Sequence, residues 1–410
     1  MNPKFDKMDS NNSDKSNLLA LRNFATNELE SILKFWLENG IDNVNGGFVG
    51  KIDSLGKPDY DAPKGLILNA RVLWSFSVAY KTLKRPELLE AAHRAYNYIT
   101  TYFADKKYGG YFWMLNSKGE PVDTKKQIYA QAFVIYGFSE YFAITQNHDC
   151  LEAALAAFKH IENYSFDNLK NGYFEAFTRE WDEIGDLRLS TKDMNEKKTM
   201  NTHLHVLEAY ATLYNVSKEP QLEKPIRNLL DIFIYTILNK DDYHYDLFFD
   251  ENWTRKSDII SYGHDIEGSW LLYEAAEILE DEQYIEKLKK IAIKMAGEVL
   301  QAINKDGGLE HDRHRGEEGD GDLEWWAQAE ALVGLINAYQ LSGNSQFVDV
   351  AVRLKDFIDK YFIDKKLGEW YYRLDKNYTP YNEYDKAGFW KCPYHNSRMC
   401  FELLKRLKDI

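Results

Sequence analysis

The 410-residue chain lacks most features that mark disulfide-rich, secreted or membrane-spanning proteins. Its three cysteines, Cys150, Cys392 and Cys400, have no metal-ligand spacing, and their odd number argues against a disulfide framework, so we expect reduced thiols. No apolar run approaches the roughly 18 residues that would span a bilayer, and the N-terminus has no charged-then-apolar secretory pattern. We therefore expect a soluble, cytoplasmic protein without a membrane partner.

Clustered positive charge is also missing. The formal net charge is −14 at pH 7, and binding to a phosphate backbone needs grouped Lys and Arg, so we expect no nucleic-acid partner. The sequence contains no P-loop, no dinucleotide-binding fingerprint and no Gly-x-Ser-x-Gly nucleophile elbow.

Aromatic residues, in contrast, are abundant: 28 Tyr, 22 Phe and 10 Trp make up 15% of the chain. Sugar rings present apolar C–H faces that stack on aromatic side chains, so this composition favours a carbohydrate-binding cleft. Packing in the protein core remains the expected role of the majority of these residues.

Apolar residues recur at helical spacing in twelve segments separated by Gly, Pro, Asn and Asp. The odd-numbered segments are expected at Leu18–Asn39, Pro86–Phe103, His148–Ser165, Gln221–Ile237, Asp281–Ala302 and Ser345–Phe362. The even-numbered segments are expected at Gly65–Leu83, Thr124–Thr145, Thr199–Ser217, Gly263–Ile278, Gly321–Ser342 and Pro393–Lys408.

A cluster of Gly and aromatic residues returns at intervals of about 60 residues, which indicates six copies of a two-helix unit. Alternating aromatic residues beside Gly are typical of short β-hairpins, and we expect one hairpin to cap each helix pair. The clusters are Gly46–Phe48, Gly109–Phe112, Gly172–Phe174, Gly307–Leu309 and Gly368–Trp370, with a copy lacking Gly at Tyr243–Phe249.

Six helix pairs can close into a ring of inner and outer helices or stack as an open solenoid. Asp281–Ala302 has one wet face, whereas Gly263–Ile278 and Thr199–Ser217 carry small and aromatic residues on most sides, as a ring requires. We therefore predict an all-α (α/α)6 barrel with short β-hairpins at one end, and the solenoid is the alternative. One domain is expected over 18–410, after a disordered polar tail over 1–17.

The residues best suited to chemistry fall in the first two turns of even-numbered segments, which places them at one end of the barrel. They are Arg71, Tyr129, Asn201, His205, His264, Glu267, Trp325, Trp326 and His395. This distribution predicts a single active site at that end.

Asn201, His205 and Glu208 share one helix face, whereas His203 projects from another. Two His at i and i+2 cannot chelate one ion from the same helix, so the pair does not indicate a metal site. If the shared face looks into the barrel, His205 is a site residue and His203 packs against neighbours.

His264 and Glu267 also lie on one face, directly after Gly263. A carboxylate beside an imidazole fixes its tautomer and raises its basicity, as a proton-transfer base requires. A capping role for Asp265 or Glu267 is the alternative.

Three further residues extend the candidate site. Pro393 starts the last helix and so places His395 in its first turn. Arg71 is a permanent charge in an apolar helix and needs either a carboxylate or a reaction anion as partner. We expect Trp326 rather than Trp325 to face the cavity, because Glu330 follows Trp326 at i+4 and would line the same side.

Two acidic clusters, Glu310–His314 and Glu317–Asp322, resemble ligand-rich loops but have no known cation-loop spacing. We interpret them as a solvated loop near the cavity rim.

These motifs together resemble those of the cellobiose 2-epimerases, members of the N-acylglucosamine 2-epimerase superfamily. The most specific stretches are Asn201–Glu208, Ser261–Glu267, Trp325–Glu330 and Trp390–Arg398, and the resemblance covers nearly everything after the tail. The Gly-His-Asp-Ile-Glu form is more similar to cellobiose epimerases than to relatives acting on N-acylglucosamine or free mannose. Gly268 departs from the small alkyl residue expected there.

The resemblance implies an (α/α)6 barrel that needs no cofactor and no metal, with His264 and His395 as the proton-transferring pair. It further implies that Arg71 and His205 hold the reacting oxygens and that Glu267 supports His264. The residues expected to bind the sugar are Tyr129, Asp193, Asn201, Trp326, Glu330 and Trp390.

The expected reaction inverts C2 of the reducing-end glucose in a β-1,4-linked disaccharide, by ring opening and a cis-enediolate. Cellobiose would give glucosyl-mannose, and lactose would give epilactose. The alternatives are an aldose–ketose isomerase acting on mannose or related free sugars, a glycoside hydrolase or lyase, and a carbohydrate-binding repeat protein. The expected partner is the small-molecule substrate alone, for a monomer or homodimer.

Overall fold

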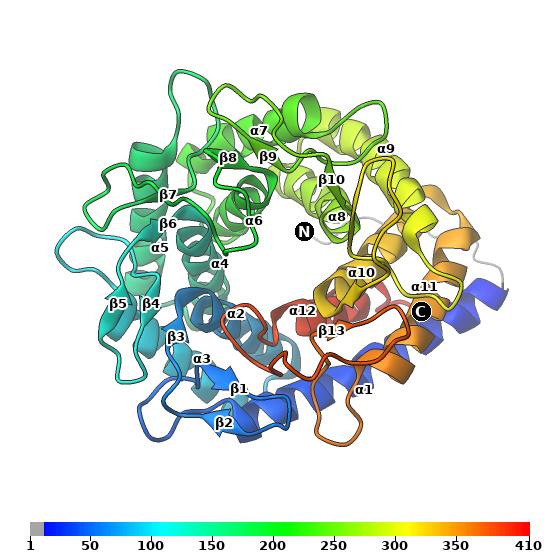
Figure 1. Cartoon of the computed structure of the whole chain (residues 1–410), viewed down its shortest axis with the longest axis horizontal. Coiled ribbons are helices and arrows are strands. Elements are labelled where there is room, and N and C mark those ends of the chain that lie inside the picture. The colour runs from blue at the N-terminus through cyan, green and yellow to red at the C-terminus, as the bar shows by residue number, and fades with distance from the viewer. Residues whose placement is uncertain (1–11) are drawn as a thin grey trace.

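The computed structural model describes residues 12–410, which form a ring of six inner helices enclosed by six outer ones (Figure 1). The inner helices are α2 (Leu66–Leu83), α4 (Ile128–Thr145), α6 (Met200–Ser217), α8 (Tyr262–Leu279), α10 (Trp325–Ser342) and α12 (Tyr394–Arg406). The outer helices are α1 (Asn12–Asn39), α3 (Pro86–Tyr98), α5 (His148–His160), α7 (Glu223–Ile232), α9 (Glu282–Val299) and α11 (Ser345–Phe357).

The ring is closed. Each inner helix packs against the inner helices on both sides, and α12 returns to contact α2. This closure confirms the predicted (α/α)6 barrel and is incompatible with an open solenoid. None of the helices that the structure describes is long and apolar enough to cross a membrane.

Burial separates the two helix sets as the composition predicted. On inner helix α10 every residue from Ala327 to Tyr339 is buried, because both its sides face other helices. On outer helix α9 the buried side chains form one stripe that includes Leu288, Ala292 and Met295, and the remaining surface is wet. The apolar core therefore lies between the rings.

The predicted tail was wrong in part. Residues 12–17 are the start of α1, and residues 1–11 lie outside the described part of the chain. Asp14 is buried, and its carboxylate accepts hydrogen bonds from Ser345 (2.6 Å) and Tyr339 (3.4 Å) on neighbouring helices. Contacts with distant residues thus order a segment whose composition is typical of disorder.

Most outer helices end in a turn of altered pitch that the sequence pattern did not separate from the helix. The wide turns are η1 (Ile99–Phe103), η2 (Ile161–Ser165), η4 (Phe233–Ile237) and η6 (Ile358–Phe362), and the tight one is η5 (Leu300–Ala302). A further tight turn, η3 (Pro220–Leu222), comes before α7.

Each Gly-aromatic cluster follows an outer helix and folds back as a minimal hairpin, as predicted. Single antiparallel bridges such as Ala104 to Tyr111 close these turns, and the copy without Gly does the same through Leu238 and Tyr245. Longer pairings, such as β6 (Lys126–Gln127) with β7 (Ala176–Phe177), join neighbouring repeats. Strands therefore link the units around the end where inner helices begin.

The predicted starts of α4 and α10 were too early because the preceding residues are strands. The other strands are β1 (Lys51–Ile52), β2 (Pro58–Asp59), β3 (Lys64–Gly65), β4 (Met114–Leu115), β5 (Pro121–Asp123), β8 (Lys198–Thr199), β9 (Phe248–Phe249), β10 (Ile259–Ser261), β11 (Asp312–His314), β12 (Leu323–Glu324) and β13 (Arg373–Leu374).

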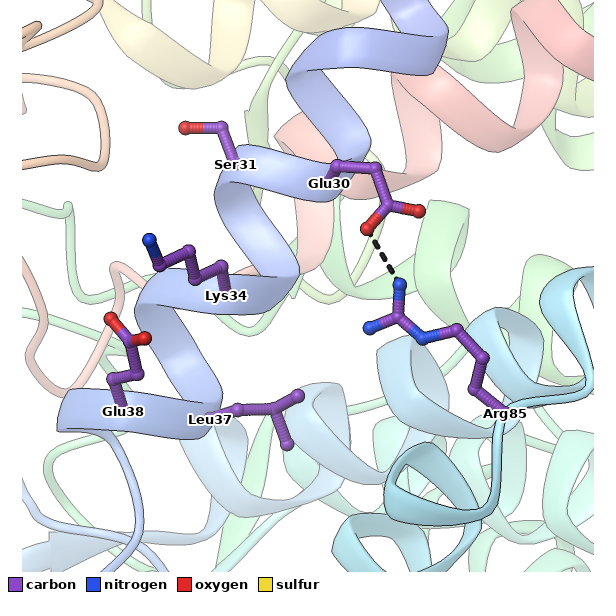
Figure 2. Close-up of a pocket in the computed structure, with 6 residues that line it drawn as sticks. All are labelled: Glu30, Ser31, Lys34, Leu37, Glu38 and Arg85. Atoms are coloured by element: carbon purple, nitrogen blue, oxygen red, sulfur yellow. Dashed lines mark hydrogen bonds and ion pairs between the residues drawn. The ribbon is translucent and has the colours of Figure 1, made fainter.

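The outer wall carries a shallow groove between α1 and the turn before α3 (Figure 2). Charged side chains dominate its lining, and Arg85 forms ion pairs there with Glu30 (2.6 Å) and Glu87 (2.9 Å). The groove involves outer elements only, so the barrel interior is the place to look for chemistry.

Candidate active site

A cavity of about 640 Å³ opens at the end of the barrel where the inner helices begin. Its volume is in the range of small-molecule sites. Every site residue that the sequence predicted lines it except Glu330; these are Arg71, Tyr129, Asp193, Asn201, His205, His264, Glu267, Trp326, Trp390 and His395.

The repeat explains why these side chains converge. The second and sixth residues of an inner helix are four apart and share the face toward the barrel axis. Tyr129, Asn201, Trp326 and His395 are second residues of their helices, and Arg71, His205, Glu267 and Glu330 are sixth residues.

The fourth residue of an inner helix has a structural role instead. His203 accepts a hydrogen bond from the backbone N–H of Tyr173 (2.9 Å) through Nε2, and its Nδ1 bonds the carbonyl of Thr199 (2.6 Å). Gln131 and Gln328 bind the corresponding turns in their repeats. The interpretation of His203 as a packing residue is therefore confirmed.

Asp265, which follows His264, occupies the same fourth position. Its carboxylate accepts hydrogen bonds from the Tyr245 backbone (2.8 Å) and from Nδ1 of His244 (2.7 Å). It therefore anchors the turn of its own repeat.

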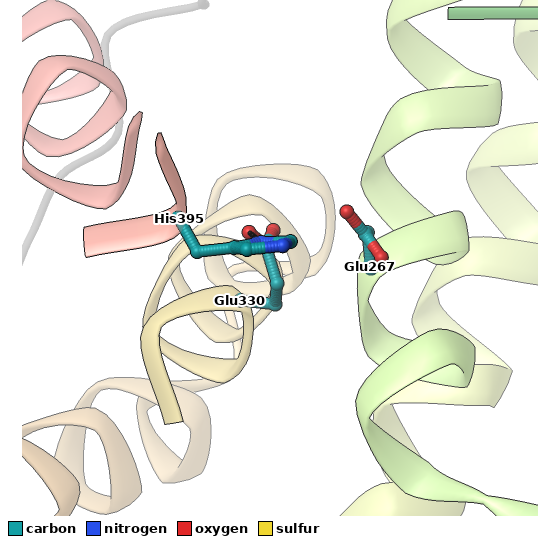
Figure 3. A group of neighbouring side chains, drawn as sticks. All are labelled: Glu267, Glu330 and His395. Atoms are coloured by element: carbon teal, nitrogen blue, oxygen red, sulfur yellow. Dashed lines mark hydrogen bonds and ion pairs between the residues drawn. The ribbon is translucent and has the colours of Figure 1, made fainter. Parts of the chain in front are cut away.

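His395 is held from behind by a carboxylate. Its Nδ1 lies 2.7 Å from Glu330 Oε1, and Figure 3 shows Glu267 facing this pair from α8. Burial, with the nearby charges of Arg71 and Arg398, lowers the pKa of His395 well below its ordinary value. With Nδ1 bound to Glu330, Nε2 of the imidazole is left for the cavity.

Glu330 itself is fully buried and is absent from the cavity wall. The expectation that it lines the cavity beside Trp326 was wrong, because it points at His395, Arg398 (2.6 Å) and Trp270 (3.3 Å). Glu330 therefore orients His395 from behind and does not line the cavity.

Arg398, which the sequence analysis did not single out, joins three buried carboxylates. Its guanidinium pairs with Glu208, Glu267 and Glu330. Glu267, Glu330 and His395 have ligand atoms within 4.8 Å of one another, a spacing that could suit a metal ion, but the guanidinium already contacts both carboxylates. Burial and the Glu330 charge raise the pKa of Glu267 to about 7, although Arg398 opposes this.

His205 is oriented in a similar way. Its Nδ1 lies 2.8 Å from Glu208 Oε2, one helical turn away, and Tyr394 donates to the other oxygen of Glu208 (2.9 Å). Arg398 and His205 lower the pKa of Glu208 to about 2 against the effect of burial, so this carboxylate is ionised.

His264 differs from the other two histidines. Its Nδ1 meets the Ser261 hydroxyl (2.8 Å), and in the described part of the chain no hydrogen bond joins it to Glu267. The expected support of His264 by Glu267 was therefore wrong, because Glu267 turns toward Arg398. Burial, helped by His205 and His311, lowers the pKa of His264 to about 3.

Arg71 is the charge most available to a ligand. It donates to the Tyr129 hydroxyl (2.7 Å) and the Trp390 carbonyl (3.3 Å), and it lies over the ring of Phe133. No carboxylate forms an ion pair with it among residues 12–410. Of the two partners that the sequence allowed, a structural carboxylate or a reaction anion, the described structure therefore does not provide the carboxylate.

Trp326 lies against both candidate bases, 4.7 Å from the His264 ring and 5.7 Å from the His395 ring. A Cβ at Gly263 would stand 2.6 Å from the Trp326 ring, so glycine there lets the indole approach α8. Trp325 also reaches the cavity wall but is only 2% exposed, in agreement with the expected core position.

The rim holds further aromatic residues that the sequence analysis missed. Tyr372 and Tyr384 stack at 4.9 Å, and Phe389 packs against Trp390 and Trp113. All but Trp113 line the cavity, and their signal in the sequence was the aromatic run that continues after Gly368.

Asp193 and Asn201 also line the cavity, as the sequence predicted. Asp193 accepts hydrogen bonds from the backbone and hydroxyl of Ser190, which shape its loop. The buried Oδ1 of Asn201 has no partner in the described structure and is free to bind a ligand.

The acidic segment Glu310–His314 was only partly as expected. Its residues Asp312–His314 are strand β11, paired with β10, and His311 and Asp312 line the cavity. His311 meets Asp312 (3.2 Å) and the edge of the Trp326 ring. This segment is therefore a wall of the site and not merely a solvated loop, whereas Glu317 and Glu318 are exposed.

Known proteins share this combination of barrel and site. The family described as N-acylglucosamine 2-epimerase matches residues 46–397. The chain is 47% identical over 374 residues to the cellobiose 2-epimerase of Bacteroides fragilis, which covers 91% of this chain and 95% of that protein. It is 39% identical to the cellobiose 2-epimerase of Dictyoglomus turgidum, over 92% of this chain and 96% of that one.

Solved structures of related proteins have the same barrel fold. The cellobiose 2-epimerase of Bacillus thermoamylovorans superposes with a TM-score of 0.89 at 39% identity, over 95% of this chain and 100% of that one. A D-mannose isomerase has a TM-score of 0.81 at 22% identity over 93% and 97%, a likeness of fold alone. The chain therefore belongs to the N-acylglucosamine 2-epimerase family, and it is an enzyme of the isomerase class.

Proposed function

We propose that the protein is a cellobiose 2-epimerase, which reversibly inverts C2 of the reducing-end glucose in β-1,4-linked disaccharides. Cellobiose gives glucosyl-mannose, and lactose gives epilactose. The observation that carries this proposal is that His264 and His395 line one cavity, each with Nδ1 bound to a protein group and each beside Trp326.

Inversion at C2 needs a base on one face of the carbon and an acid on the other. Opening of the sugar ring first exposes the C1 aldehyde, which acidifies the C2 proton. One histidine removes that proton, the electrons of the C2–H bond form the C1–C2 double bond, and the electrons of the C1 carbonyl move to its oxygen, which gives a cis-enediolate. The other histidine, protonated, then delivers a proton to the opposite face of C2.

The enediolate carries negative charge that fixed donors must stabilise. Arg71 supplies charge-assisted hydrogen bonds from a site without a carboxylate partner, and it is oriented by Tyr129 and the Trp390 carbonyl. His205, fixed by Glu208, presents Nε2 to the same cavity and holds a reacting oxygen.

A second sugar fits at the rim. With the reacting glucose against Trp326 in the interior, the non-reducing sugar would lie on Trp390 and Phe389, near Asp193. Aromatic faces suit the apolar faces of sugar rings. This rim is the feature that favours a disaccharide over a free monosaccharide.

Hydrolysis of the glycosidic bond is less well supported. It requires two carboxylates that flank the scissile bond, one of them free to give up a proton. Here Glu267 and Glu330 are both paired with Arg398, and Glu330 is outside the cavity lining. Aldose–ketose isomerisation shares the enediolate and differs only in protonation at C1.

Incubation of the protein with cellobiose in D2O, followed by NMR, tests the proposal. Deuterium at C2 of a mannose-containing disaccharide is the expected result. Free glucose would instead show hydrolysis, and a ketose as sole product would show isomerisation; either outcome overturns the proposal.

A further inference from the structure

The side chain of Ser261, at the start of α8, makes an unusual hydrogen bond to His264. Ser261 is the N-cap of α8, yet its hydroxyl makes no cap hydrogen bond and instead lies 2.8 Å from His264 Nδ1. Thr199 occupies the same place before α6 and does cap, accepting from the N–H of Thr202 (3.1 Å). Because Ser favours the capping bond where it is available, its diversion at α8 calls for a specific reason.

The strand pairing supplies a second partner for the hydroxyl. Ser261 on β10 is directly opposite Asp312 on β11. Burial raises the pKa of Asp312, and its buried Oδ1 has no hydrogen-bond partner in the described structure, so this carboxylate is an acceptor toward which the Ser261 hydroxyl can turn. A hydroxyl that donates to a carboxylate has its oxygen left to accept, and the donor in reach is Nδ1–H of His264.

We propose that Ser261 is a positioning residue for the epimerisation, which fixes His264 in the tautomer with the proton on Nδ1, so that Nε2 offers its lone pair to the C2 proton. The inference rests on the proposed function and adds to it the tautomer of His264 and a role for Ser261. The hydroxyl does for His264 what Glu330 does for His395, but without placing a negative charge on the ring.

Other groups around His264 do not perform this task. The titratable groups that line the same cavity are His205 on α6, Glu267 on α8, His311 and Asp312 at β11, Glu324 on β12 and His395 on α12. In the described structure the hydrogen bond to His264 comes from Ser261 alone. Burial, with the neighbouring His205 and His311, lowers the pKa of His264 to about 3, and the neutral hydroxyl adds no charge that would oppose this.

NMR of the protein with ¹⁵N-labelled histidine tests the tautomer without relying on activity. We expect His264 to carry its proton on Nδ1 in the wild type and to lose this preference in Ser261→Ala. Ser261→Thr keeps the hydroxyl and should restore it. A wild-type His264 protonated on Nε2, or a tautomer unaffected by Ser261→Ala, would overturn the inference.

The pH profile of kcat/KM provides a second test. Ser261→Asp puts a carboxylate against Nδ1 and keeps a good N-cap residue, so the variant should fold. A carboxylate stabilises the imidazolium, so the pKa of His264 rises and the acid limb of the profile moves to higher pH by roughly 1–3 units. An unchanged acid limb in active enzyme would contradict the role proposed for Ser261.

Thr199→Ala is the matched control. It removes a true cap from α6 and should lower Tm without changing the His264 tautomer or the acid limb. If the wild type puts no deuterium at C2, the proposed function fails. If the wild type does put deuterium at C2, but the Ser261 variants keep the wild-type His264 tautomer and acid limb, only the inference about Ser261 fails.

Discussion

The two sides of the cavity hold their histidines in different ways. On the α12 side, His395 is backed by Glu330, which is itself bound by Arg398 and Trp270 inside the barrel core. On the α8 side, His264 is backed by a neutral hydroxyl on an edge strand, next to the rim segment His311–Asp312. A carboxylate stabilises an imidazolium and a hydroxyl does not, so the two rings differ in their readiness to carry a proton.

We propose that the groups behind the rings act on them differently: Glu330 can support a proton on His395, whereas the Ser261 hydroxyl orients His264 without a charge. In a reversible epimerisation each histidine acts as the base in one direction and as the acid in the other.

The largest expected effect comes from removing the charge behind His395. Glu330→Gln keeps the shape but removes the carboxylate that fixes the ring and supports its cation. Turnover should fall on the order of 10³–10⁴, as for other catalytic histidines that lose their carboxylate, with far-UV circular dichroism unchanged. Ser261→Ala should lower turnover much less. Equal losses of turnover in the two variants would contradict the difference between the two sides of the cavity.

Arg71 is expected to come next, because in the proposed mechanism it stabilises the intermediate that both histidines share. Arg71→Ala should lower kcat on the order of 10²–10³ through loss of enediolate stabilisation. Arg71→Lys keeps the charge without the planar donor set and should recover only part of the rate. A change confined to KM would argue that Arg71 binds ground state and transition state alike.

Variants of His203 and His205, both on α6, should distinguish an effect on stability from an effect on catalysis. His203→Ala leaves the buried N–H of Tyr173 without its acceptor and should cost about 1–3 kcal/mol of unfolding free energy, measured by urea denaturation. Activity per folded molecule should stay close to wild type. His205→Ala should show the reverse pattern, and a severe loss of activity in folded His203→Ala would contradict the assignment.

The smallest effect on chemistry is expected at Gly268, on the outer side of α8. A Cβ there would stand 2.4 Å from Cε2 of the Tyr245 ring, whose buried hydroxyl has no partner in the described structure. Gly268→Ala should destabilise the protein by about 1–3 kcal/mol through overpacking. The wild-type kcat should remain, and pairing the change with Tyr245→Leu should recover stability.

Much of the barrel could be predicted because local patterns agree with it. Helical apolar spacing, the Gly-aromatic turns and the contrast between wet and dry helices each report a residue's immediate environment. Where the local signal was misleading, as at residues 12–17, the cause was burial against α10 and α11, which no local pattern contains.

The site could be predicted as a list of residues, and Glu208 was expected on the helix face of His205, but the partners of His264 and His395 could not be predicted. Glu267 was matched with His264 because they lie three apart on a helix, yet the guanidinium of Arg398, 131 positions away in the chain, takes the carboxylate. Glu330 was expected in the cavity for a similar reason and turned inward to His395, 65 positions away.

The amino-acid order alone thus determined the ring of helices, the end of the barrel that carries the chemistry and nearly all the residues that line it. Only the folded chain decided which groups stand behind His264 and His395: Glu330 reaches His395 from another helix, and Arg398 takes Glu267 away from His264, whose partner is the nearby Ser261 hydroxyl. The physical reason is that these contacts between helices form only when the ring closes.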